Sequence, residues 1–428
     1  MDITIFPAKR VAGHIQLPGD KSISHRLALL GAISTGKTTV EHFASSQDCH
    51  STLTCLEALG VGIEKFEGSR IVIQGRGLEG LTPPLLTLDA GNSGSTIRML
   101  SGILAGQQFQ STISGDDSLR RRPMKRVIVP LQQMGASIQA GLGDFPPLTI
   151  KGTKLRPIRY TLPVASAQVK SAILLAGLYA DGRTTVIEPV PTRNHTELAL
   201  GGFGGHVTVE GNAVTVTGRQ QLHGIHARVP GDISSAAFFL AGAALLADSE
   251  IRMEGVGLNA GRRGIVDIMR KMGASVEIGN ERIQGGEPVG DLCARTSELR
   301  GGKISGNEVP QVIDEIPILA VLGTQSVEGI EIRDASELRV KESDRIRSIV
   351  ENLRSMGAAV EEFPDGLVVA GQQSLKGTRI ITYGDHRIAM AFAIGGLLAR
   401  GETVIQDAEC AAVSFPGFFE NLQRLIVL

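Results

Sequence analysis

A unit of helix and strand recurs six times along the 428-residue chain, and this repetition limits the folds that it can adopt. Each copy has a polar helix start, an apolar helix rich in Ala and Leu, a Gly or Asp break and a short β-branched strand. The copies start 66 to 82 residues apart, at Asp20, Asn92, Ser166, Asp232, Asp314 and Asp385. This spacing is too long for a solenoid of single hairpins and indicates a larger supersecondary unit.

A second motif lies between these helices and adds a helix and strands to each unit. It reads ALGVGIE at 58–64, QMGASIQ at 133–139, KMGASVE at 271–277 and SMGAAVE at 355–361, with a degenerate copy, GGFGGHVTVEG, at 201–211. Each copy is typical of a helix that ends at a left-handed Gly and is followed directly by a strand. The repeated unit is therefore predicted as βαβαββ.

The turn LPGD at 17–20 reappears as VPGD at 229–232, and each copy leads into a repeat helix. We therefore predict an α/β (α+β) chain in two lobes of three units, with crossovers near Gly19 and Gly231. One lobe spans 20–230, and the other spans 1–19 plus 231–428. With 42% hydrophobic residues the chain can form two cores, because single cores stop growing at roughly 250 to 300 residues.

The composition argues against nucleic-acid and membrane partners. The formal net charge is −1 and aromatic residues make up only 4% of the chain, so neither a general field nor stacking platforms attract nucleic acid. There is no run of about 18 uncharged apolar residues and no signal-peptide core. We expect a cytoplasmic protein with reduced cysteines, no cofactor and no metal site.

The segment GAISTGKT at 31–38 matches the phosphate-binding pattern GxxxxGK[ST], but its context is wrong. A P-loop follows a strand and opens a helix, whereas this segment closes one helix and opens a strand. We therefore expect Lys37 to be an exposed turn residue and the chain not to bind ATP there.

Basic residues gather at the starts of the repeat helices, where they oppose the helix dipole and so suggest a function. The groups are Lys21 with Ser22 and Arg26, Asn92 to Arg98, Arg122 before Pro123, Lys341 to Arg345, and Asp385 to Arg387. For any one helix, simple capping is the favoured explanation of the polar residue at its start; the alternative is that several helix tips face a common cleft and bind anions. For Arg120 and Arg121 we favour a solvated loop.

Two carboxylates, Asp314 and Glu342, accompany these cations, and no metal-ligand set or Ser/His/Asp order is evident. Bidentate arginines hold phosphate and carboxylate groups, and carboxylates move protons. The residues alone thus predict transfer chemistry on a polyanionic small molecule.

Seven motifs, LPGDKSISHR, GNSGSTIR, RRPM, SAQVKSA, DEIP, LRVKESDR and GDHRIAM, together resemble the 5-enolpyruvylshikimate-3-phosphate synthase family along essentially the whole chain. The resemblance implies a two-lobed inside-out α/β barrel of six βαβαββ units, with helix tips facing the cleft. It implies transfer of the enolpyruvyl group of phosphoenolpyruvate to the 5-hydroxyl of shikimate 3-phosphate, through a tetrahedral intermediate that then loses inorganic phosphate.

The resemblance also implies residue roles. Asp314 would remove the proton of the 5-hydroxyl as a general base. Glu342, assisted by Lys21, would exchange a proton with the methylene carbon. The shikimate 3-phosphate site would comprise Lys21, Ser22, Arg26, Ser166, Gln168, Arg193, Asp314 and Lys341. The phosphoenolpyruvate site would comprise Lys21, Asn92, Gly94, Arg122, Gln168, Arg345, His386 and Arg387.

The chain departs from many family members at three positions: Ala167 stands for a Ser, Ser95 for a Thr, and Val413 for a Lys that contacts phosphoenolpyruvate. Glyphosate tolerance in the family is linked to a bulkier residue at the position of Gly94, so we predict that the inhibitor fits this chain, with Ser95 and Val413 able to weaken it.

Two other functions stay open at this point. The related enolpyruvyl transferase that acts on UDP-N-acetylglucosamine shares the repeat fold, but it usually carries a reactive Cys in the loop that reads SGDDSLRRRPM here at 114–124. A shared fold alone does not fix the substrate. A non-catalytic phosphometabolite-binding protein is the second alternative. We expect a monomer whose partners are its two small-molecule substrates.

Overall fold

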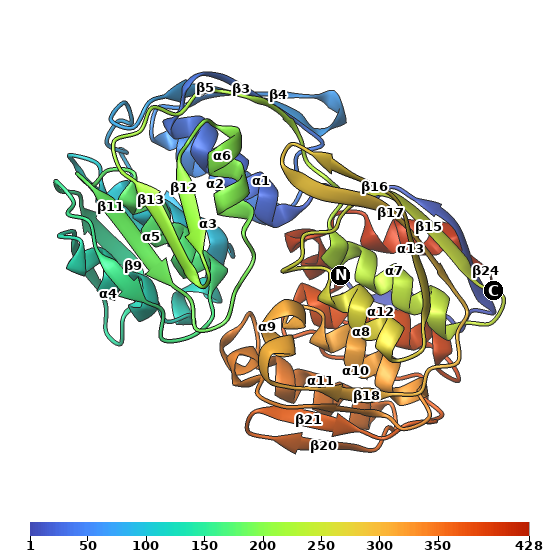
Figure 1. Ribbon diagram of the computed structural model, residues 1–428. Helices are drawn as coiled ribbons and strands as arrows, with labels where there is room; N and C mark the ends of the chain where they lie inside the picture. Colours follow the sequence, from blue (N-terminus) through green and yellow to red (C-terminus); the bar gives the residue numbers. More distant parts are fainter. Residues whose placement is uncertain (428) are drawn as a thin grey trace. The chain divides into compact units, whose positions relative to one another are not determined.

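The computed structural model describes residues 1–427, which divide into two compact units (Figure 1). Unit 1 comprises Met1–Pro18, Pro230–Arg282 and the chain from Pro288 onward. Unit 2 comprises Gly19–Val229 together with Ile283–Glu287, which contains the end of strand β16, the turn after it and the first residue of β17. Each unit has its own hydrophobic core.

Unit 2 contains three four-stranded sheets around buried helices. The sheet orders are β14-β3-β5-β4, β6-β7-β9-β8 and β10-β11-β13-β12, and in each sheet the first pair is parallel and the other pairs are antiparallel. The strands are β3 (Thr35–Glu41), β4 (Gly62–Phe66), β5 (Arg70–Arg76), β6 (Leu88–Asp89), β7 (Gln110–Ser114), β8 (Ser137–Gly141), β9 (Phe145–Lys151), β10 (Arg159–Thr161), β11 (Arg183–Ile187), β12 (Val207–Glu210), β13 (Ala213–Thr217) and β14 (His226–Arg228).

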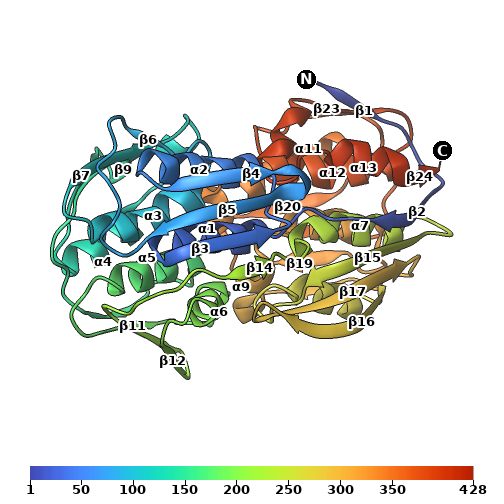
Figure 2. The ribbon, with the colours of Figure 1, turned by 90° about the horizontal axis from the view of Figure 1, so that it is seen from above.

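The helices of unit 2 alternate between largely buried ones and ones that are partly exposed. The buried ones are α1 (Lys21–Ile33), α3 (Gly94–Ala105) and α5 (Ala167–Gly177), and the others are α2 (Gln47–Ala58), α4 (Lys125–Gln133) and α6 (His195–Gly202). Helix α3 packs against both α1 and α5, and the sheets lie outside them, as β3, β4 and β5 do over α1 in Figure 2. Helices inside and sheets outside make an inverted barrel.

Unit 1 repeats this plan with a larger and a smaller sheet. The sheet orders are β16-β17-β15-β2-β24, β18-β19-β21-β20 and β1-β23-β22. The strands are β1 (Ile3–Ile5), β2 (Arg10–Ile15), β15 (Glu250–Gly257), β16 (Ser275–Gln284), β17 (Glu287–Arg295), β18 (Gly302–Ile304), β19 (Ile330–Ile332), β20 (Val360–Phe363), β21 (Gly366–Val369), β22 (Arg379–Ile380), β23 (Thr403–Ile405) and β24 (Ile426–Val427). The last repeat lacks the closing hairpin, and β1 pairs with β23 instead.

Three helices form the centre of unit 1 and contact one another: α7 (Ile233–Leu245), α10 (Ile316–Gln325) and α12 (His386–Leu398). Around them lie α8 (Gly264–Lys271), the short α9 (Val309–Val312), α11 (Arg345–Ser355) and α13 (Phe418–Leu425). The predicted fold class is thereby confirmed in its essentials: six helix-and-sheet units, three in each half.

The glycine motif between the repeat helices behaves as predicted. Gly60, Gly135, Gly273 and Gly357 have φ values of +86°, +109°, +98° and +81°, and the degenerate copy has Gly204 at +81°. Residues with a Cβ rarely adopt such angles. Each Gly follows a helix and precedes a strand, so it reverses the chain within a few residues.

The segment that matches a P-loop pattern closes a helix and opens a strand as predicted, but Lys37 lies on that strand and not in a turn. Helix α1 runs to Ile33 and strand β3 begins at Thr35, so the Gly-rich stretch closes a helix and leads into a strand. Lys37 is exposed on that strand. The geometry of a P-loop, strand then helix, is absent there.

Candidate active site

The tips of the buried helices in unit 2 are capped by side chains. The carboxylate of Asp20 accepts from the backbone N–H of Ile23 at 2.8 Å at the start of α1. Ser166 is the N-cap of α5. At the start of α3 the cap is Ser93, which accepts from the N–H of Thr96 at 3.1 Å. Asn92, the predicted start of that repeat, is therefore free for another role.

Asn92 instead helps to hold Arg122. The guanidinium of Arg122 donates to the Oδ1 and the carbonyl oxygen of Asn92 at 2.7 and 3.2 Å, and to the hydroxyl of Ser118 at 3.0 Å. The Nδ2 of Asn92 donates to Asp116 at 2.8 Å. Arg122 is only 5% exposed, so its orientation is fixed. It lies three residues before α4, which begins at Lys125 rather than at the predicted Pro123.

Gly94 lies close to two guanidinium groups. A Cβ at this position would stand 2.7 Å from Nη1 of Arg98 and 3.4 Å from Nη1 of Arg122. Arg98 donates to Oε1 of Gln168 at 2.7 Å, and Nε2 of Gln168 donates to Ser95 at 2.9 Å. The structure thus joins the tips of α3 and α5, and it adds Arg98 to the site residues that we predicted.

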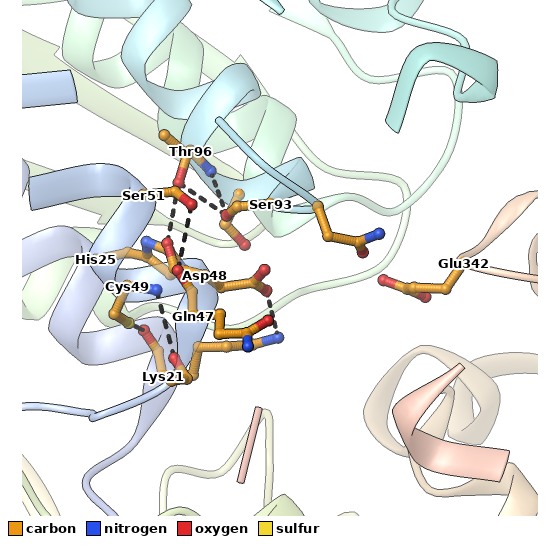
Figure 3. Close-up of polar contacts among 12 residues, drawn as sticks. Lys21, His25, Gln47, Asp48, Cys49, Ser51, Ser93, Thr96 and Glu342 are labelled. Atoms are coloured by element: carbon orange, nitrogen blue, oxygen red, sulfur yellow. Dashed lines mark hydrogen bonds and ion pairs between the residues drawn. The ribbon is translucent and has the colours of Figure 1, made fainter. Parts of the chain in front are cut away.

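Lys21 is paired with Asp48, a residue that the sequence analysis did not select (Figure 3). Its Nζ lies 2.8 Å from Oδ2 of Asp48, and the two side chains are 16% and 8% exposed. Asp48 is in the first turn of α2, behind the N-cap Ser46. In the sequence it looks like an ordinary acidic residue at a helix start, so only the fold reveals its partner.

Arg26 is buried beneath the tips of α1, α5 and α6. It donates to Thr196 at 2.7 Å, to Ser171 at 2.9 Å and to the carbonyl oxygen of Ser22 at 2.9 Å. Burial lowers the pKa of its guanidinium to about 10, and the charge of nearby Arg193 acts in the same direction. Two predicted cations of the shikimate 3-phosphate site are thus close enough to repel each other.

In unit 1 the predicted base, Asp314, lies among arginines. Its carboxylate oxygens are 3.4 Å from Nη1 of Arg345, 3.7 Å from Nη1 of Arg262 and 4.0 Å from Nη2 of Arg387. Arg387 also donates to the Asp314 carbonyl oxygen at 2.8 Å. The side chain of Asp314 is 17% exposed, so water or a ligand can reach it. Arg262 was not predicted, because an Arg in a turn before a helix gives no sequence signal.

Asp314 is not the helix cap that its place in the repeat indicated. Helix α10 begins at Ile316, and Glu315 occupies the N-cap position without a side-chain cap bond. Glu315 bonds to the hydroxyl of Ser234, and Arg262 donates to the same hydroxyl at 2.7 Å. The DEIP segment therefore places one carboxylate in the packed interior and leaves the other partly exposed.

Arg345 is the most enclosed cation of the set, with 1% exposure. It bonds to Asp385 at 2.8 Å and to Glu342 at 2.5 Å. Burial acts to lower its pKa, but the charges of Asp385, Glu342 and Asp314 hold that pKa above the usual value. Arg345 therefore stays protonated, and it connects both predicted proton carriers.

Lys341 and His386 complete the predicted residues of unit 1. Lys341 is half-buried, and burial lowers the pKa of its ammonium group. His386 is the first residue of α12 and is 1% exposed, so its ring lies deeper than the carboxylates of Asp314 and Glu342. Asp385, its neighbour, caps α12 and bonds to Arg345.

Within residues 1–427 no group of three or more His, Cys, Asp and Glu side chains is arranged to hold a metal ion. None of the helices described in that range is both long enough and apolar enough to cross a bilayer.

In each unit, arginines and lysines gather at the tips of buried helices, and in unit 1 they surround partly exposed carboxylates. Such a set defines an enzyme that binds phosphorylated or carboxylated small molecules and moves protons on them. The chain belongs to the EPSP synthase (3-phosphoshikimate 1-carboxyvinyltransferase) family, whose sequence profile matches residues 5–422.

Relatives and solved structures agree with this family. A 3-phosphoshikimate 1-carboxyvinyltransferase of Solibacter usitatus is 53% identical over 425 residues, covering 99% of this chain and 100% of that protein. One of Desulforamulus reducens is 50% identical over 428 residues, covering 100% of both. An EPSP synthase structure from Acinetobacter baumannii superposes with a TM-score of 0.87 at 42% identity, covering 100% and 98% of the two chains. The predictions of family, fold and transferase class are confirmed.

Proposed function

We propose that this protein transfers the enolpyruvyl group of phosphoenolpyruvate to the 5-hydroxyl of shikimate 3-phosphate and releases inorganic phosphate. The reaction belongs to the shikimate pathway of aromatic amino-acid biosynthesis. One observation carries the assignment of roles: Asp314 and Glu342, both partly exposed, bond to the same buried Arg345. The reaction needs two separate proton carriers, one for a hydroxyl and one for a carbon.

Binding of shikimate 3-phosphate is assigned to cations and polar groups of both units. In unit 2 these are Lys21, Ser22, Arg26, Ser166, Gln168 and Arg193, and in unit 1 they are Asp314 and Lys341. The hydrogen bonds of Arg26 to Thr196 and Ser171 fix its guanidinium before substrate arrives, which reduces the entropy lost on binding.

Phosphoenolpyruvate binding is assigned to Lys21, Asn92, Gly94, Arg122, Gln168, Arg345, His386 and Arg387. Gly94 allows the ligand to approach the backbone of α3 closely, and Arg122 is held in place by Asn92 and Ser118. Arginine suits this task because its fork binds carboxylate and phosphate through two parallel bonds.

In the addition step, Asp314 removes the proton of the 5-hydroxyl, whose oxygen attacks C2 of phosphoenolpyruvate. The Asp314 carboxylate that accepts this proton lies within 4.0 Å of three arginines, Arg345, Arg262 and Arg387. Glu342, assisted by Lys21, delivers a proton to the methylene carbon. The product of this step is a tetrahedral intermediate that still carries phosphate.

In the elimination step, the C–O bond to phosphate breaks and a proton leaves the methyl carbon, so the enol double bond forms again. Glu342 accepts that proton, because it gave one to the same carbon. The bond between Glu342 and Arg345 has to loosen for the carboxylate to reach substrate. Closure of the protein around both substrates would exclude water and strengthen these electrostatic interactions.

The remaining features of the proposal are a monomeric, cytoplasmic enzyme without metal or cofactor, and without nucleic-acid or membrane partners. UDP-N-acetylglucosamine is the alternative acceptor substrate. The segment 114–124 contains no Cys, and the curated relatives carry the other transferase name, so we favour shikimate 3-phosphate.

Release of inorganic phosphate tests the proposal directly. The protein is mixed with phosphoenolpyruvate and shikimate 3-phosphate, and separately with phosphoenolpyruvate and UDP-N-acetylglucosamine. We expect phosphate only in the first mixture. Release only in the second would indicate the alternative acceptor, and binding of both substrates without any release would indicate a non-catalytic protein.

A further inference from the structure

A buried cluster of three charged side chains lies beneath the loop that carries Arg193. Nζ of Lys170, on α5, is 2.9 Å from Glu188 and 2.7 Å from Glu197, and these side chains are 1%, 4% and 7% exposed. Glu188 follows strand β11, and Glu197 is in the first turn of α6. A buried ion pair adds little net stability because desolvation offsets its attraction. A role in holding a particular geometry explains such a cluster better.

Glu188 uses its second oxygen to fix the loop. While Oε2 faces Lys170, Oε1 accepts from the backbone N–H of Thr192 at 3.2 Å and from the Thr192 hydroxyl. The backbone N–H of Glu188 donates to the Asn212 carbonyl at 2.9 Å, which fixes this residue beside the sheet. The segment 188–192 is therefore closed by one carboxylate, immediately before Arg193.

The loop has to hold Arg193 near another cation. Arg193 is close enough to Arg26 for its charge to act on the Arg26 guanidinium, and Glu197 opposes that effect. Two guanidinium groups repel each other, so this repulsion acts against keeping Arg193 beside Arg26. The bonds of Glu188 resist this repulsion at Thr192.

We infer that Lys170 and Glu188 are positioning residues for Arg193, which they hold ready for shikimate 3-phosphate. This inference rests on the proposed function for the identity of the anion. Neither residue is expected to touch substrate. Their effect should therefore appear in the binding of shikimate 3-phosphate and should be transmitted through Arg193 alone.

The test begins with Thr192→Val, which removes the hydroxyl while keeping the size and the backbone N–H. We expect the dissociation constant for shikimate 3-phosphate, measured by calorimetry on the full chain, to rise about 5- to 30-fold, the effect of one hydrogen bond to a charged group. The kcat and the KM for phosphoenolpyruvate should change less than about twofold, since the rest of the site is unaltered. A matched control is Thr215→Val, which loses a 2.9 Å bond to Thr185 in the same sheet and should bind normally.

Two further variants separate positioning from general damage. In an Arg193→Ala background, Thr192→Val should have no added effect on binding, because its target is already gone. Glu188→Gln keeps an acceptor oxygen for Thr192 and should lose less affinity than Glu188→Ala. Normal affinity of Thr192→Val, or an equal loss with and without Arg193, would overturn the inference. Failure of the proposed function would appear separately, as an unaltered protein that releases no phosphate.

Discussion

The arginines of the two units have different partners, although Lys21 of unit 2 is paired with the carboxylate of Asp48. In unit 2, Arg26 and Arg122 donate mainly to hydroxyl, amide and carbonyl oxygens, whereas in unit 1 Arg345 faces three carboxylates. Neutral acceptors orient a guanidinium without cancelling its charge. Carboxylates offset much of that charge. The contrast suggests a division of work in which unit 2 mostly attracts anions and unit 1 mostly moves protons.

Asp314→Asn should have the largest effect, because it removes the predicted base from unit 1. We expect turnover to fall by about 10²- to 10⁴-fold, the usual scale for a lost general base, while shikimate 3-phosphate still binds. Phosphate release and calorimetry measure the two quantities. Asp267→Asn, which alters a half-exposed carboxylate of the same unit, is the control. Near-normal turnover of Asp314→Asn would show that the base has been misassigned.

Arg122→Lys tests the binding role of unit 2. A lysine keeps the charge but loses the fork that donates to Asn92 and Ser118, so the KM for phosphoenolpyruvate should rise about 10- to 100-fold. The neighbouring Arg121 is exposed, and Arg121→Lys should leave the KM unchanged. Equal losses in both variants would mean that general charge, and not a fixed geometry, attracts the substrate.

Gly94→Ala measures how tightly the two guanidinium groups enclose the tip of α3. The new methyl would meet Arg98 at 2.7 Å and push it toward the ligand. We expect glyphosate to compete with phosphoenolpyruvate in the unaltered protein, and its inhibition constant to rise about tenfold or more in the variant, the equivalent of about 1.4 kcal/mol. The control is Gly201→Ala, because a Cβ at Gly201 has nothing within 4 Å. It should leave the inhibition constant for glyphosate unchanged.

His25 is sensitive to the positive charges around it in unit 2, and the expected effect is the smallest of the four. It appears in the stability of the protein. Burial, Lys21 and Arg26 hold the pKa of His25 well below 6.5, so below that pH the unfolded chain binds a proton that the folded chain does not. The free energy of unfolding should therefore fall as the pH drops below 6.5, by up to about 1.4 kcal/mol per unit. Denaturant titrations at several pH values should show that the free energy of unfolding of His25→Gln depends less steeply on pH. The same dependence on pH in both proteins would refute this prediction.

The repeat pattern was sufficient to predict the fold because each signal is local. A left-handed Gly such as Gly135 and an apolar helix such as α7 are visible within a dozen residues. The exceptions are tertiary. In the last repeat, strand β23 pairs with β1 from the other end of the chain. The N-cap of α3 is Ser93 and not Asn92, whose side chain bonds to Arg122 and Asp116.

Site residues could be predicted from the sequence only where they belong to a recognisable motif. Asp48 and Arg262 were missed because each looks like an ordinary charged residue in a helix or turn, and their partners lie 27 and 52 positions away in Lys21 and Asp314. Arg98 was noted among the basic residues at a helix start but was not assigned to the site, and its partner Gln168 lies 70 positions away. Such pairings depend on how helix tips meet. The roles assigned to the predicted residues stay predictions until the variants are measured.

The chain leaves unit 1 and returns to it at neighbouring points. The backbone N–H of Asp232 donates to the carbonyl oxygen of Pro18 at 3.0 Å, so the segment that leaves unit 1 and the segment that returns to it lie side by side. Unit 2 is, in topological terms, an insertion into a host fold. A gene that encodes the chain from Pro230 onward, a linker and then Met1–Pro18 would therefore express unit 1, together with Ile283–Glu287, as one continuous polypeptide.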